Sequence, residues 1–413
     1  MVTHRSARIQ CRTAVTGGSQ SGQSAVSGSL AAHRSLLAEE FPWTGEAVYL
    51  NAASIGPLPM RTRRAVEEYA ALRSAPHRMQ ERHFFPLLAE ARRLAARLIN
   101  ADPDEIALAA NTSYGINLAA RSLPLAAGDV VLLSAREFPA NVYPWLALQS
   151  KGIAVEIVPV TGEGWPDETR LLERVQDPRV RVLAVSLVQF GSGYAVDLGR
   201  LSRACRESRT WLAVDAIQGI GQLPVDVRDT PVDVLACGGQ KWLLSPWGSG
   251  FVYVRRELFD VLPPADVGWM AYAGTDDLNR LTEYGSTLRP NARRYELVTL
   301  PYQDVAGFVA SVGLLLDIGI DALRDHLMEI EAPLLEWAAR HGVTVSSPTD
   351  AGHRSGIVCL DIPAAARAYA SLRRAGIVTS LREGSIRVSP HLYNTRDDLE
   401  RVGEVLTGAL AAG

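Results

Sequence analysis

Lysine is nearly absent from this chain of 413 residues. Lys151 and Lys241 are the only two, so arginine supplies the other 40 of the 42 basic residues. A guanidinium group neither loses its proton near neutral pH nor forms an imine, whereas a lysine amine does both. A lysine kept in an arginine-rich chain is therefore a candidate for covalent chemistry. Lys241 is the first candidate, because it directly follows an apolar segment that ends in two glycines, VDVLACGGQKW.

Cysteine is also scarce, and its four positions show no CxxC spacing: Cys11, Cys205, Cys237 and Cys359. This pattern argues against a disulfide framework and against a metal site, and we expect a reducing cytoplasm. No apolar run approaches the roughly 20 residues needed to cross a bilayer. The net charge of -3 gives no electrostatic reason to expect nucleic acid or a membrane surface as a partner.

The composition predicts a globular protein with a short unstructured start. Hydrophobic residues make up 47% of the chain and charged residues 21%, which is ordinary for a folded domain. Residues 1–29 are rich in Ser, Gly, Gln and Thr, so we expect a disordered tail without a secretory signal. We expect residues 30–60 to pack on the small domain and the active site, 61–300 to form a large domain, and 301–413 to form a smaller C-terminal domain.

Apolar segments alternate with helical periodicity through the middle of the chain. The apolar segments are 129–134, 155–160, 180–190, 211–216 and 232–239, and helical patterns lie between them. This alternation predicts a mostly parallel sheet covered by helices on both faces, an α/β fold. Ligands bind at the carboxyl ends of the strands in such sheets, and Asp215 and the 238–241 turn follow two of these ends.

A polar turn in the segment 106–123 separates an expected strand from an expected helix. Thr112 and Ser113 stand where the helix begins, so their side chains either cap the helix or join its free N–H groups in binding an anion. The two roles are compatible.

An aspartate, a lysine and an anion-binding helix start together suit pyridoxal phosphate (PLP). The lysine forms a Schiff base, the carboxylate pairs with the pyridinium nitrogen, and the helix start holds the phosphate.

Seven segments carry a family resemblance, in this order: YLNAAS (49–54), NTSYGIN (111–117), EFPANVYPW (137–145), VDAIQ (214–218), GGQKW (238–242), YELVT (295–299) and IRVSPHLYNT (386–395). From about residue 48 to its end, the chain resembles the class V aminotransferase family of fold-type I PLP enzymes, which includes cysteine desulfurases and isopenicillin N epimerase-like proteins. The resemblance implies a large domain with a seven-stranded, mostly parallel sheet and a smaller C-terminal α/β domain. It also implies a homodimer with active sites at the subunit interface.

The resemblance also implies residue roles. Lys241 is the Schiff-base lysine and general acid/base. The remaining cofactor contacts are Asp215 at the pyridinium nitrogen, Gln218 at the 3′ oxygen, Phe138 near the ring, and, at the phosphate, Thr112, Ser113, Gln240 and, from the other subunit, Thr299. The substrate is an amino acid whose α-carboxylate is clamped by Arg387, with Ala53 and His391 in the same site.

Three departures from the cysteine desulfurases bear on the reaction. Those enzymes read EHHAN, with the second histidine stacked on the cofactor, where this chain has Phe138 and Pro139, and either of these lies against the ring. The segment SLREGSIR carries no persulfide cysteine, and Cys359 lies in an apolar strand as a core residue. Phe190 or Gln189 replaces an asparagine that contacts the 3′ oxygen. A persulfide-type desulfurase is therefore disfavoured.

What remains is a PLP enzyme with one obvious proton carrier, Lys241. We expect β-elimination, of the C–S lyase type, with transamination as the alternative, and then epimerisation or decarboxylation. Epimerisation prefers a second base, for which the candidates are His77, His83, Tyr272 and His391. A larger substrate could face an aromatic and arginine-rich region that contains Trp269, Tyr272, Arg289, Arg293, Arg294 and Tyr295.

The sequence gives less support to two other classes of protein. A nucleotide-binding protein needs a third glycine that GSGYAV (191–196) and GSGFVY (248–253) lack. A protein that binds PLP without catalysis has no need of the lysine, the aspartate and the carboxylate-binding arginine together.

Overall fold

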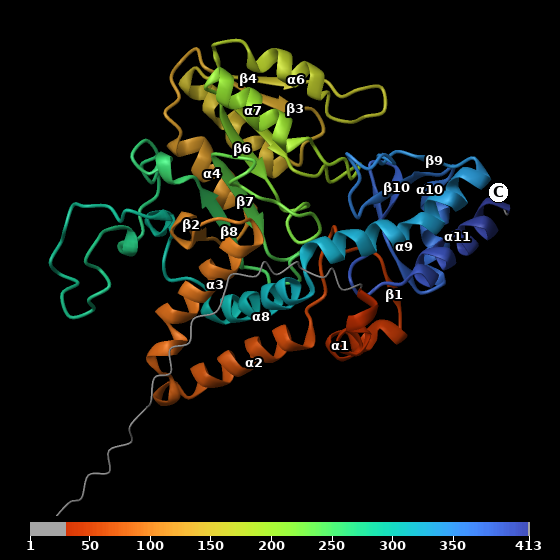
Figure 1. The fold of residues 1–413 in the computed structure, drawn as a ribbon, viewed down its shortest axis with the longest axis horizontal. Helices are drawn as coiled ribbons and strands as arrows, with labels where there is room; N and C mark the ends of the chain where they lie inside the picture. The colour runs from red at the N-terminus through yellow and green to blue at the C-terminus, as the bar shows by residue number, and fades with distance from the viewer. Residues whose placement is uncertain (1–29, 412–413) are drawn as a thin grey trace, which may run out of the picture.

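A computed structural model of the chain describes residues 30–411, so the expected tail 1–29 lies outside the described residues. Its main sheet has seven strands in the order β2-β8-β7-β6-β5-β3-β4 (Figure 1). Their bounds are β2 Ile106–Leu108, β3 Val130–Ser134, β4 Ala154–Val158, β5 Val180–Ser186, β6 Trp211–Asp215, β7 Val234–Gly238 and β8 Gly250–Val254. Only β8 runs against its neighbours. The expected fold, α/β with a mostly parallel sheet, is confirmed.

Both faces of this sheet are buried. Along β7, Val234 and Ala236 pack into one hydrophobic cluster, and Leu235 and Cys237 pack into the other. Such alternation arises because successive strand side chains point to opposite faces. One face is covered by α4 (Thr112–Ser122) and α5 (Tyr143–Leu146), and the other by α3 (Phe85–Leu98), α6 (Glu168–Val175) and α7 (Leu198–Ser208). The strand ends, rather than the faces, are therefore left for a ligand.

The helical region after residue 60 is divided into two helices. α2 (Met60–Ser74) ends before Pro76, and α3 begins with Pro86 in its first turn. A proline disfavours helical geometry in the residue before it and suits the start of a helix, which explains both limits. α8 (Tyr302–Ile318) packs against α2 and α3.

α9 (Ile320–His341) follows α8 after Gly319, with a bend of 73° between the two helices. No single helix in residues 30–411 is long and apolar enough to cross a membrane, and α8 with α9 passes that test only as a bent pair, by length and composition.

A second, antiparallel sheet forms the C-terminal part, in the order β12-β13-β10-β9. Its strands are β9 Thr344–Val345, β10 Val358–Asp361, β12 Ser380–Arg382 and β13 Ser385–Val388, accompanied by α10 (Ala365–Arg374) and α11 (Arg396–Ala411). The expected small α/β unit is present. The exact boundary at residue 301 stays our proposal, since α8 contacts helices of the large domain.

The N-terminal segment contacts both parts. α1 (Arg34–Glu40) precedes β1 (Val48–Tyr49), which pairs in parallel with β11 (Ile377–Val378) of the C-terminal part. Farther along, the Gly56 N–H donates to the Gln240 carbonyl oxygen at 2.8 Å, beside Lys241. This segment therefore links the small unit to the lysine turn.

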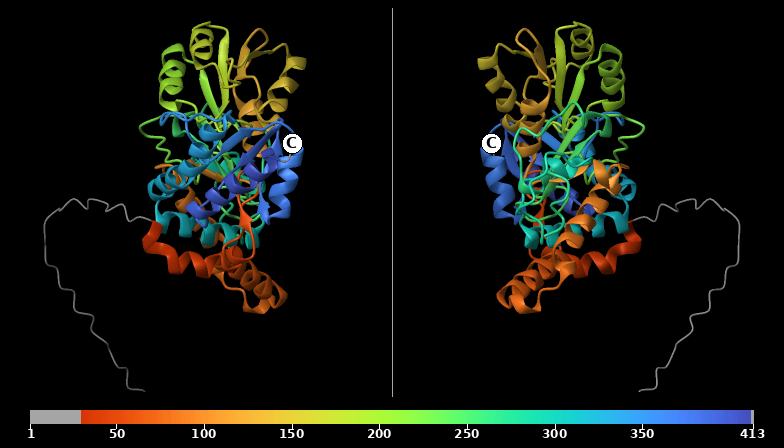
Figure 2. Two further views of the ribbon diagram at one scale, coloured as in Figure 1. Left: turned by 90° about the vertical axis from the view of Figure 1, so that its right-hand side faces the viewer. Right: turned by 90° about the vertical axis from the view of Figure 1, so that its left-hand side faces the viewer.

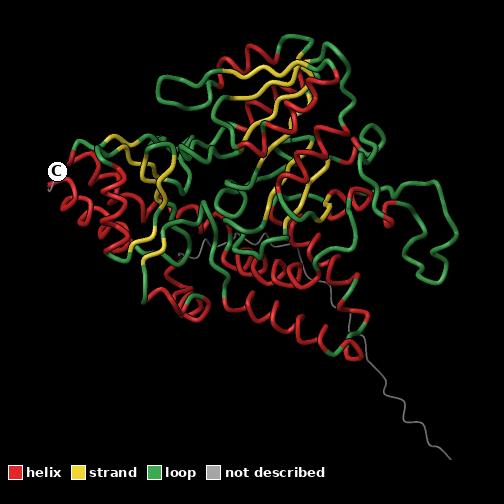
Figure 3. Tube along the Cα trace, turned by 180° about the vertical axis from the view of Figure 1, so that it is seen from behind, coloured by secondary structure: helices red, strands yellow, loops and turns green. Residues whose placement is uncertain are grey.

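The loop-rich segment 263–300 extends from the large domain, at the end of the molecule opposite the C-terminal unit (Figures 1 and 2). It is almost entirely loop (Figure 3), with two short 3-10 turns, Trp269–Ala271 and Ala292–Tyr295. Just beyond the second turn, Glu296 forms a buried ion pair with Arg92 of α3, with N–O distances of 2.7 and 2.6 Å. The Leu108 N–H also donates to this carboxylate at 2.9 Å.

Substitution Glu296→Ala tests this attachment. It leaves the Arg92 guanidinium buried without its anion and Leu108 without an acceptor, so we expect the free energy of unfolding to fall by about 3–5 kcal/mol. Urea denaturation followed by fluorescence measures the change. The matched control is Glu283→Ala, which removes an exposed partner of Arg280 and should leave the midpoint unchanged. Equal midpoints for both variants would contradict a structural role for the buried pair.

Candidate active site

Lys241 and Asp215 come together because their strands are neighbours. Asp215 is the last residue of β6, and Lys241 lies three residues beyond the end of β7. The two strands are parallel, and Asp215 pairs in register with Ala236. Both residues therefore stand at the carboxyl edge of the sheet, as the sequence predicted.

Burial brings the pKa values of these two groups toward each other. Burial raises the pKa of Asp215 to about 6, against the opposing attraction of Lys241, and the carboxylate accepts one hydrogen bond, from the Ile217 N–H at 3.1 Å. Burial also lowers the pKa of Lys241 to about 8, an effect that Asp215 opposes and the positive charge of Arg387 reinforces. A neutral, nucleophilic amine is thus well populated near pH 8.

The start of α4 lies against the lysine turn. The capping residue is Asn111, whose Oδ1 accepts from the Tyr114 N–H at 2.9 Å, so the expectation that Thr112 or Ser113 caps the helix was wrong. Thr112 Oγ1 instead accepts from the Gly238 N–H at 2.9 Å. The first turn of α4 keeps its remaining N–H groups and its positive dipole end for an anion.

Two glycines allow this close approach. A Cβ on Gly115 would lie 2.5 Å from the Ala236 Cβ, so α4 can pack tightly on β7 only without one. A Cβ on Gly238 would lie 2.6 Å from Gln240 Oε1 and 3.3 Å from Thr112 Oγ1. The polar side chains of Gln240 and Thr112 therefore converge over a bare backbone at the helix start, an arrangement that suits a phosphate.

Arg387 is a buried cation without an anionic partner in residues 30–411. Its side chain is 2% exposed, and it donates to three neutral oxygens: Ser380 Oγ at 3.2 Å, the Phe190 carbonyl at 2.7 Å and Ser54 Oγ at 2.7 Å. Burial lowers its pKa to about 10. Because an unpaired buried charge is costly, the geometry favours a bound anion here, and a guanidinium matches a carboxylate well.

An aromatic pair lies next to the lysine amine. The Phe138 ring centroid is 5.5 Å from Lys241 Nζ, and the Phe138 and Phe190 rings meet edge to face at 5.3 Å. Pro139 instead lines a neighbouring cavity. Of the two residues that the sequence left open, Phe138 is the one whose ring faces the amine.

Gln218 is buried and already hydrogen-bonded on both ends. Its Nε2 donates to the Ala53 carbonyl at 2.9 Å, and its Oε1 accepts from Trp242 Nε1 at 2.8 Å. One N–H of the amide is left for a further acceptor. Ala53 is also buried, and its N–H donates to Ser389 Oγ at 3.1 Å. Thr299 and Ser113 are exposed on the single chain.

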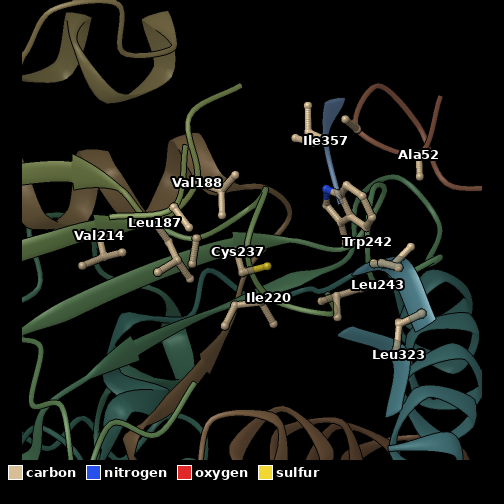
Figure 4. Packing of buried hydrophobic residues seen from close by; sticks show 14 of the residues in the cluster. Ala52, Leu187, Val188, Val214, Ile220, Cys237, Trp242, Leu243, Leu323 and Ile357 are labelled. Atoms are coloured by element: carbon tan, nitrogen blue, oxygen red, sulfur yellow. The ribbon is translucent and has the colours of Figure 1, made fainter. Parts of the chain in front are cut away.

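His391, expected to contact substrate, lies within the protein core. Its ring stacks between Trp242 and Tyr393, with centroids 5.5 and 5.8 Å away. Its Nε2 lies 3.2 Å from the Trp242 carbonyl and its Nδ1 accepts from the Leu392 N–H at 2.8 Å, while burial lowers its pKa to about 3. Both ring nitrogens are used, so His391 supports Trp242 and presents neither nitrogen to a ligand. Trp242 itself packs among Ala52, Leu243 and Ile357 (Figure 4).

Three residues of the aromatic and arginine-rich region are also structural. Arg289 donates to Asp276 and to the Met270 carbonyl, both at 2.6 Å, and Arg294 donates to the Arg289 carbonyl at 2.6 Å. The Tyr295 hydroxyl donates to the Leu262 carbonyl at 2.8 Å. All three side chains are buried, so the idea that they face a substrate was wrong. The positive charge of an arginine does not by itself show that its side chain faces a substrate.

The buried carboxylate of Glu137 is a feature that sequence reasoning missed. It accepts from the Ser186 N–H at 2.8 Å, from Gln189 Nε2 at 2.7 Å, from Asn141 Nδ2 at 3.1 Å and from the Ser186 hydroxyl. Burial raises its pKa. Since Glu137 directly precedes Phe138, these bonds fix the position of the ring beside Lys241. In the sequence, the signal that could have revealed this role is the glutamate that begins the segment EFPANVYPW.

The described cysteines are poor candidates for sulfur chemistry. Cys205, Cys237 and Cys359 are all buried and free. The Cys359 thiol donates to the Gly191 carbonyl at 3.2 Å, and burial raises its pKa to about 11, so it is a core residue. Within residues 30–411 there is also no group of three or more His, Cys, Asp or Glu side chains that could hold a metal ion.

Comparisons with known proteins identify the family of the chain. The family model for class-V aminotransferases matches residues 48–402. A probable cysteine desulfurase of Methanothermobacter thermautotrophicus is 30% identical, over 89% of this chain and 96% of the relative. An isopenicillin N epimerase of Amycolatopsis lactamdurans is 30% identical, over 86% of this chain and 94% of the relative.

Solved structures share the fold. A cysteine desulfurase from Thermococcus onnurineus NA1 superimposes with a TM-score of 0.82 at 21% identity, covering 92% of this chain and 98% of that one. The cystine C-S lyase C-DES, in complex with its reaction product cysteine persulfide, gives a TM-score of 0.79 at 23% identity, covering 89% and 98%. The chain belongs to the class-V aminotransferase family and is a PLP-dependent enzyme.

Proposed function

We propose that this enzyme cleaves a carbon–sulfur bond in a cysteine-like or S-conjugated amino acid by β-elimination. The observation that carries the proposal is a cavity of about 750 Å³ beside Phe190, lined on one side by the short β12–β13 turn. None of the cysteines in residues 30–411 lines it, so the persulfide route lacks a thiol from this part of the chain. The same space accommodates a leaving group much larger than sulfide.

The residues at the sheet edge fit the cofactor. Lys241 would hold it covalently, Asp215 has capacity for an ion pair with the ring nitrogen, and Phe138 would lie against the ring. Thr112, Ser113 and Gln240 would hold the phosphate at the start of α4, Gln218 has one N–H for the 3′ oxygen, and Thr299 would reach the phosphate of the partner subunit. When bound, the cofactor withdraws electrons from the substrate α-carbon, which makes the α-proton acidic.

The chain's own groups then share the work of elimination. Arg387 holds the α-carboxylate, and Lys241 Nζ removes the α-proton. As the Cα–H and Cβ–S bonds break, a Cα–Cβ double bond forms and the sulfur leaves as a thiol after taking up a proton. Water then converts the released enamine to pyruvate and ammonia. Overall, one conjugate and one water yield one thiol, one pyruvate and one ammonium ion.

Transamination is the alternative, because it uses the same lysine, aspartate and arginine. It differs in its products, because the amino group is transferred to a keto acid and no group leaves Cβ. Epimerisation needs a second base, and His391 is unsuitable because both of its ring nitrogens are bonded. His77 and His83 lie in the connection between α2 and α3, where the His83 ring accepts from the Gln80 N–H. Decarboxylation has no feature in its favour here.

We extend the proposal to a cytoplasmic homodimer with active sites at the interface. The support is a set of exposed large apolar side chains in and near the projecting loop: Trp247, Val267, Trp269, Leu278, Leu281, Tyr284 and Leu297. Thr299 lies in the same stretch. Sedimentation of the purified protein as a monomer would contradict this part. The buried free cysteines suit a reducing compartment.

The reactivity of Lys241 with pH is the first prediction. In cofactor-free protein, its labelling by an amine reagent should rise with pH and reach half its maximum near pH 8, because the pKa is lowered to about 8. Mass spectrometry of the labelled peptides measures the rate, and the exposed Lys151 serves as an internal reference in the same molecule.

Two variants control the sign of this effect. Asp215→Asn removes the charge that raises the lysine pKa, so the midpoint should move to lower pH. Arg387→Ala removes a charge that lowers it, so the midpoint should move to higher pH. Shifts in the same direction, or a wild-type midpoint above pH 10, would refute the electrostatic account of the site.

The products of S-substituted cysteines test the reaction itself. We expect stoichiometric pyruvate, ammonia and thiol from S-alkyl-L-cysteines, measured by coupled assays and thiol titration. Formation of a keto acid that retains the sulfur substituent, with amino transfer to an acceptor, would identify a transaminase instead. Deuterium entering Cα without either product would point to an epimerase.

Variants assign the steps. Lys241→Ala should lower kcat by about 10³-fold or more, because the proton carrier is lost. Arg387→Ala should lower kcat/KM by about 10- to 100-fold, the loss of charge-assisted hydrogen bonds to the carboxylate. Arg374→Ala, an exposed residue of α10, is the matched control and should leave both constants unchanged.

A further inference from the structure

The cavity beside Phe190 lies between the two parts of the chain. From the large domain it is lined by residues that follow β3, β4 and β5, including Pro139 and Gln189, and from the C-terminal unit by the end of β10 and the β12–β13 turn. Its volume of about 750 Å³ exceeds what the side chain of a common amino acid needs. Both parts of the chain therefore contribute residues to the walls of this cavity.

A short path joins the cavity to the reacting groups. Phe190 lines it, and the carbonyl of the same residue accepts from Arg387 Nη1 at 2.7 Å. The Phe190 ring meets the Phe138 ring, whose other neighbour is the Lys241 amine. An amino acid with its carboxylate on Arg387 and its α-carbon at Lys241 thus has the cavity within reach of its side chain.

The cavity wall carries excess negative charge. Glu163, Asp361 and Glu383 line it with exposed side chains, and none of them forms an ion pair with any residue in 30–411. Asp361 accepts from Ser346 Oγ at 3.1 Å and from the Ser385 hydroxyl, which leaves its charge uncompensated. Among the lining residues the one cation is Arg136.

A second, independent observation is a buried hydrogen-bond acceptor that lacks a partner within the described part of the chain. The Gln189 side chain is 3% exposed, and its Nε2 donates to Glu137 at 2.7 Å. Its Oε1 has no hydrogen-bond partner within the described part of the chain. Glu137 receives three further hydrogen bonds from Asn141 and Ser186, so the amide nitrogen is the end that must face it. The oxygen is therefore directed away from Glu137 and lacks a donor, and Gln189 as a residue lines the cavity.

We infer that the cavity binds the far end of the substrate side chain when that end is a cation with N–H groups, such as a primary ammonium. Such a group supplies the donor that Gln189 lacks and balances the charge of Glu163, Asp361 and Glu383. A carboxylate there would meet unpaired carboxylates, and an alkyl end would leave the acceptor unsatisfied. The orientation of the substrate in this inference rests on the proposed function.

The test compares three cysteine conjugates of similar size: S-(2-aminoethyl)-, S-propyl- and S-(2-carboxyethyl)-L-cysteine. With the holoenzyme, kcat/KM should be about tenfold higher for the aminoethyl than for the propyl conjugate, and lowest for the carboxyethyl conjugate. Glu383→Gln and Asp361→Asn should each reduce this preference several-fold. The matched control, Glu207→Gln on the exposed face of α7, should leave it intact.

Binding without turnover separates this inference from the proposed reaction. L-Lysine, L-norleucine and L-2-aminoadipate lack a sulfur leaving group, and calorimetry should rank them in that order of affinity. If no conjugate releases pyruvate but the ranking holds, the elimination proposal fails and the subsite stands. If pyruvate forms equally from all three conjugates and the Glu383→Gln variant behaves like wild type, elimination stands and the subsite is overturned.

Discussion

Three charged side chains are held away from water at one edge of the main sheet, and the rest of the site depends on this constraint. Asp215 and Lys241 partly compensate each other, but within the described part of the chain Arg387 donates only to neutral oxygens. Burial moves all three pKa values toward the neutral forms, so the protein alone does not satisfy these charges. A ligand with an aldehyde, a protonated ring nitrogen and a carboxylate restores the balance. The same unsatisfied charges therefore define what the site accepts.

Arg387 is also the point where three parts of the chain meet. Its guanidinium donates to Phe190 of the large domain, to Ser380 of the C-terminal unit and to Ser54 of the N-terminal segment. The N-terminal segment is itself tied to the lysine turn through Gly56 and Gln240. A carboxylate bound to Arg387 competes for, or adds to, these bonds, so substrate binding is coupled to the contacts that hold the two units together. The arginine is thus a structural junction and, in the proposed function, also the group that binds the carboxylate.

Local sequence patterns predicted the features that local physics controls. The parallel sheet, the strand ends at Asp215 and Gly238, and the scarcity of lysine all led to the correct edge of the fold. The patterns failed where a role depends on tertiary contacts. In a chain with 40 arginines, composition and periodicity do not distinguish Arg387 from Arg294, which donates to carbonyl oxygens in the core; only the segment IRVSPHLYNT singled out Arg387. His391 likewise lies in a segment that matches the family, and the sequence does not show that its ring is stacked between Trp242 and Tyr393 in the core.

The departures from the desulfurase pattern are scattered in the sequence but meet in space. Phe138 and Pro139 follow β3, Gln189 and Phe190 follow β5, and the turn at residues 382–385 joins β12 to β13, and these segments line or flank one cavity. A short turn there has two consequences at once, because it removes the place of a catalytic thiol and opens room for a larger side chain. Under the proposed function, loss of the persulfide route and acceptance of a bulky substrate are then a single structural change. The proposed reaction and the proposed substrate are linked through that turn, while the buried charges at the sheet edge stay common to both.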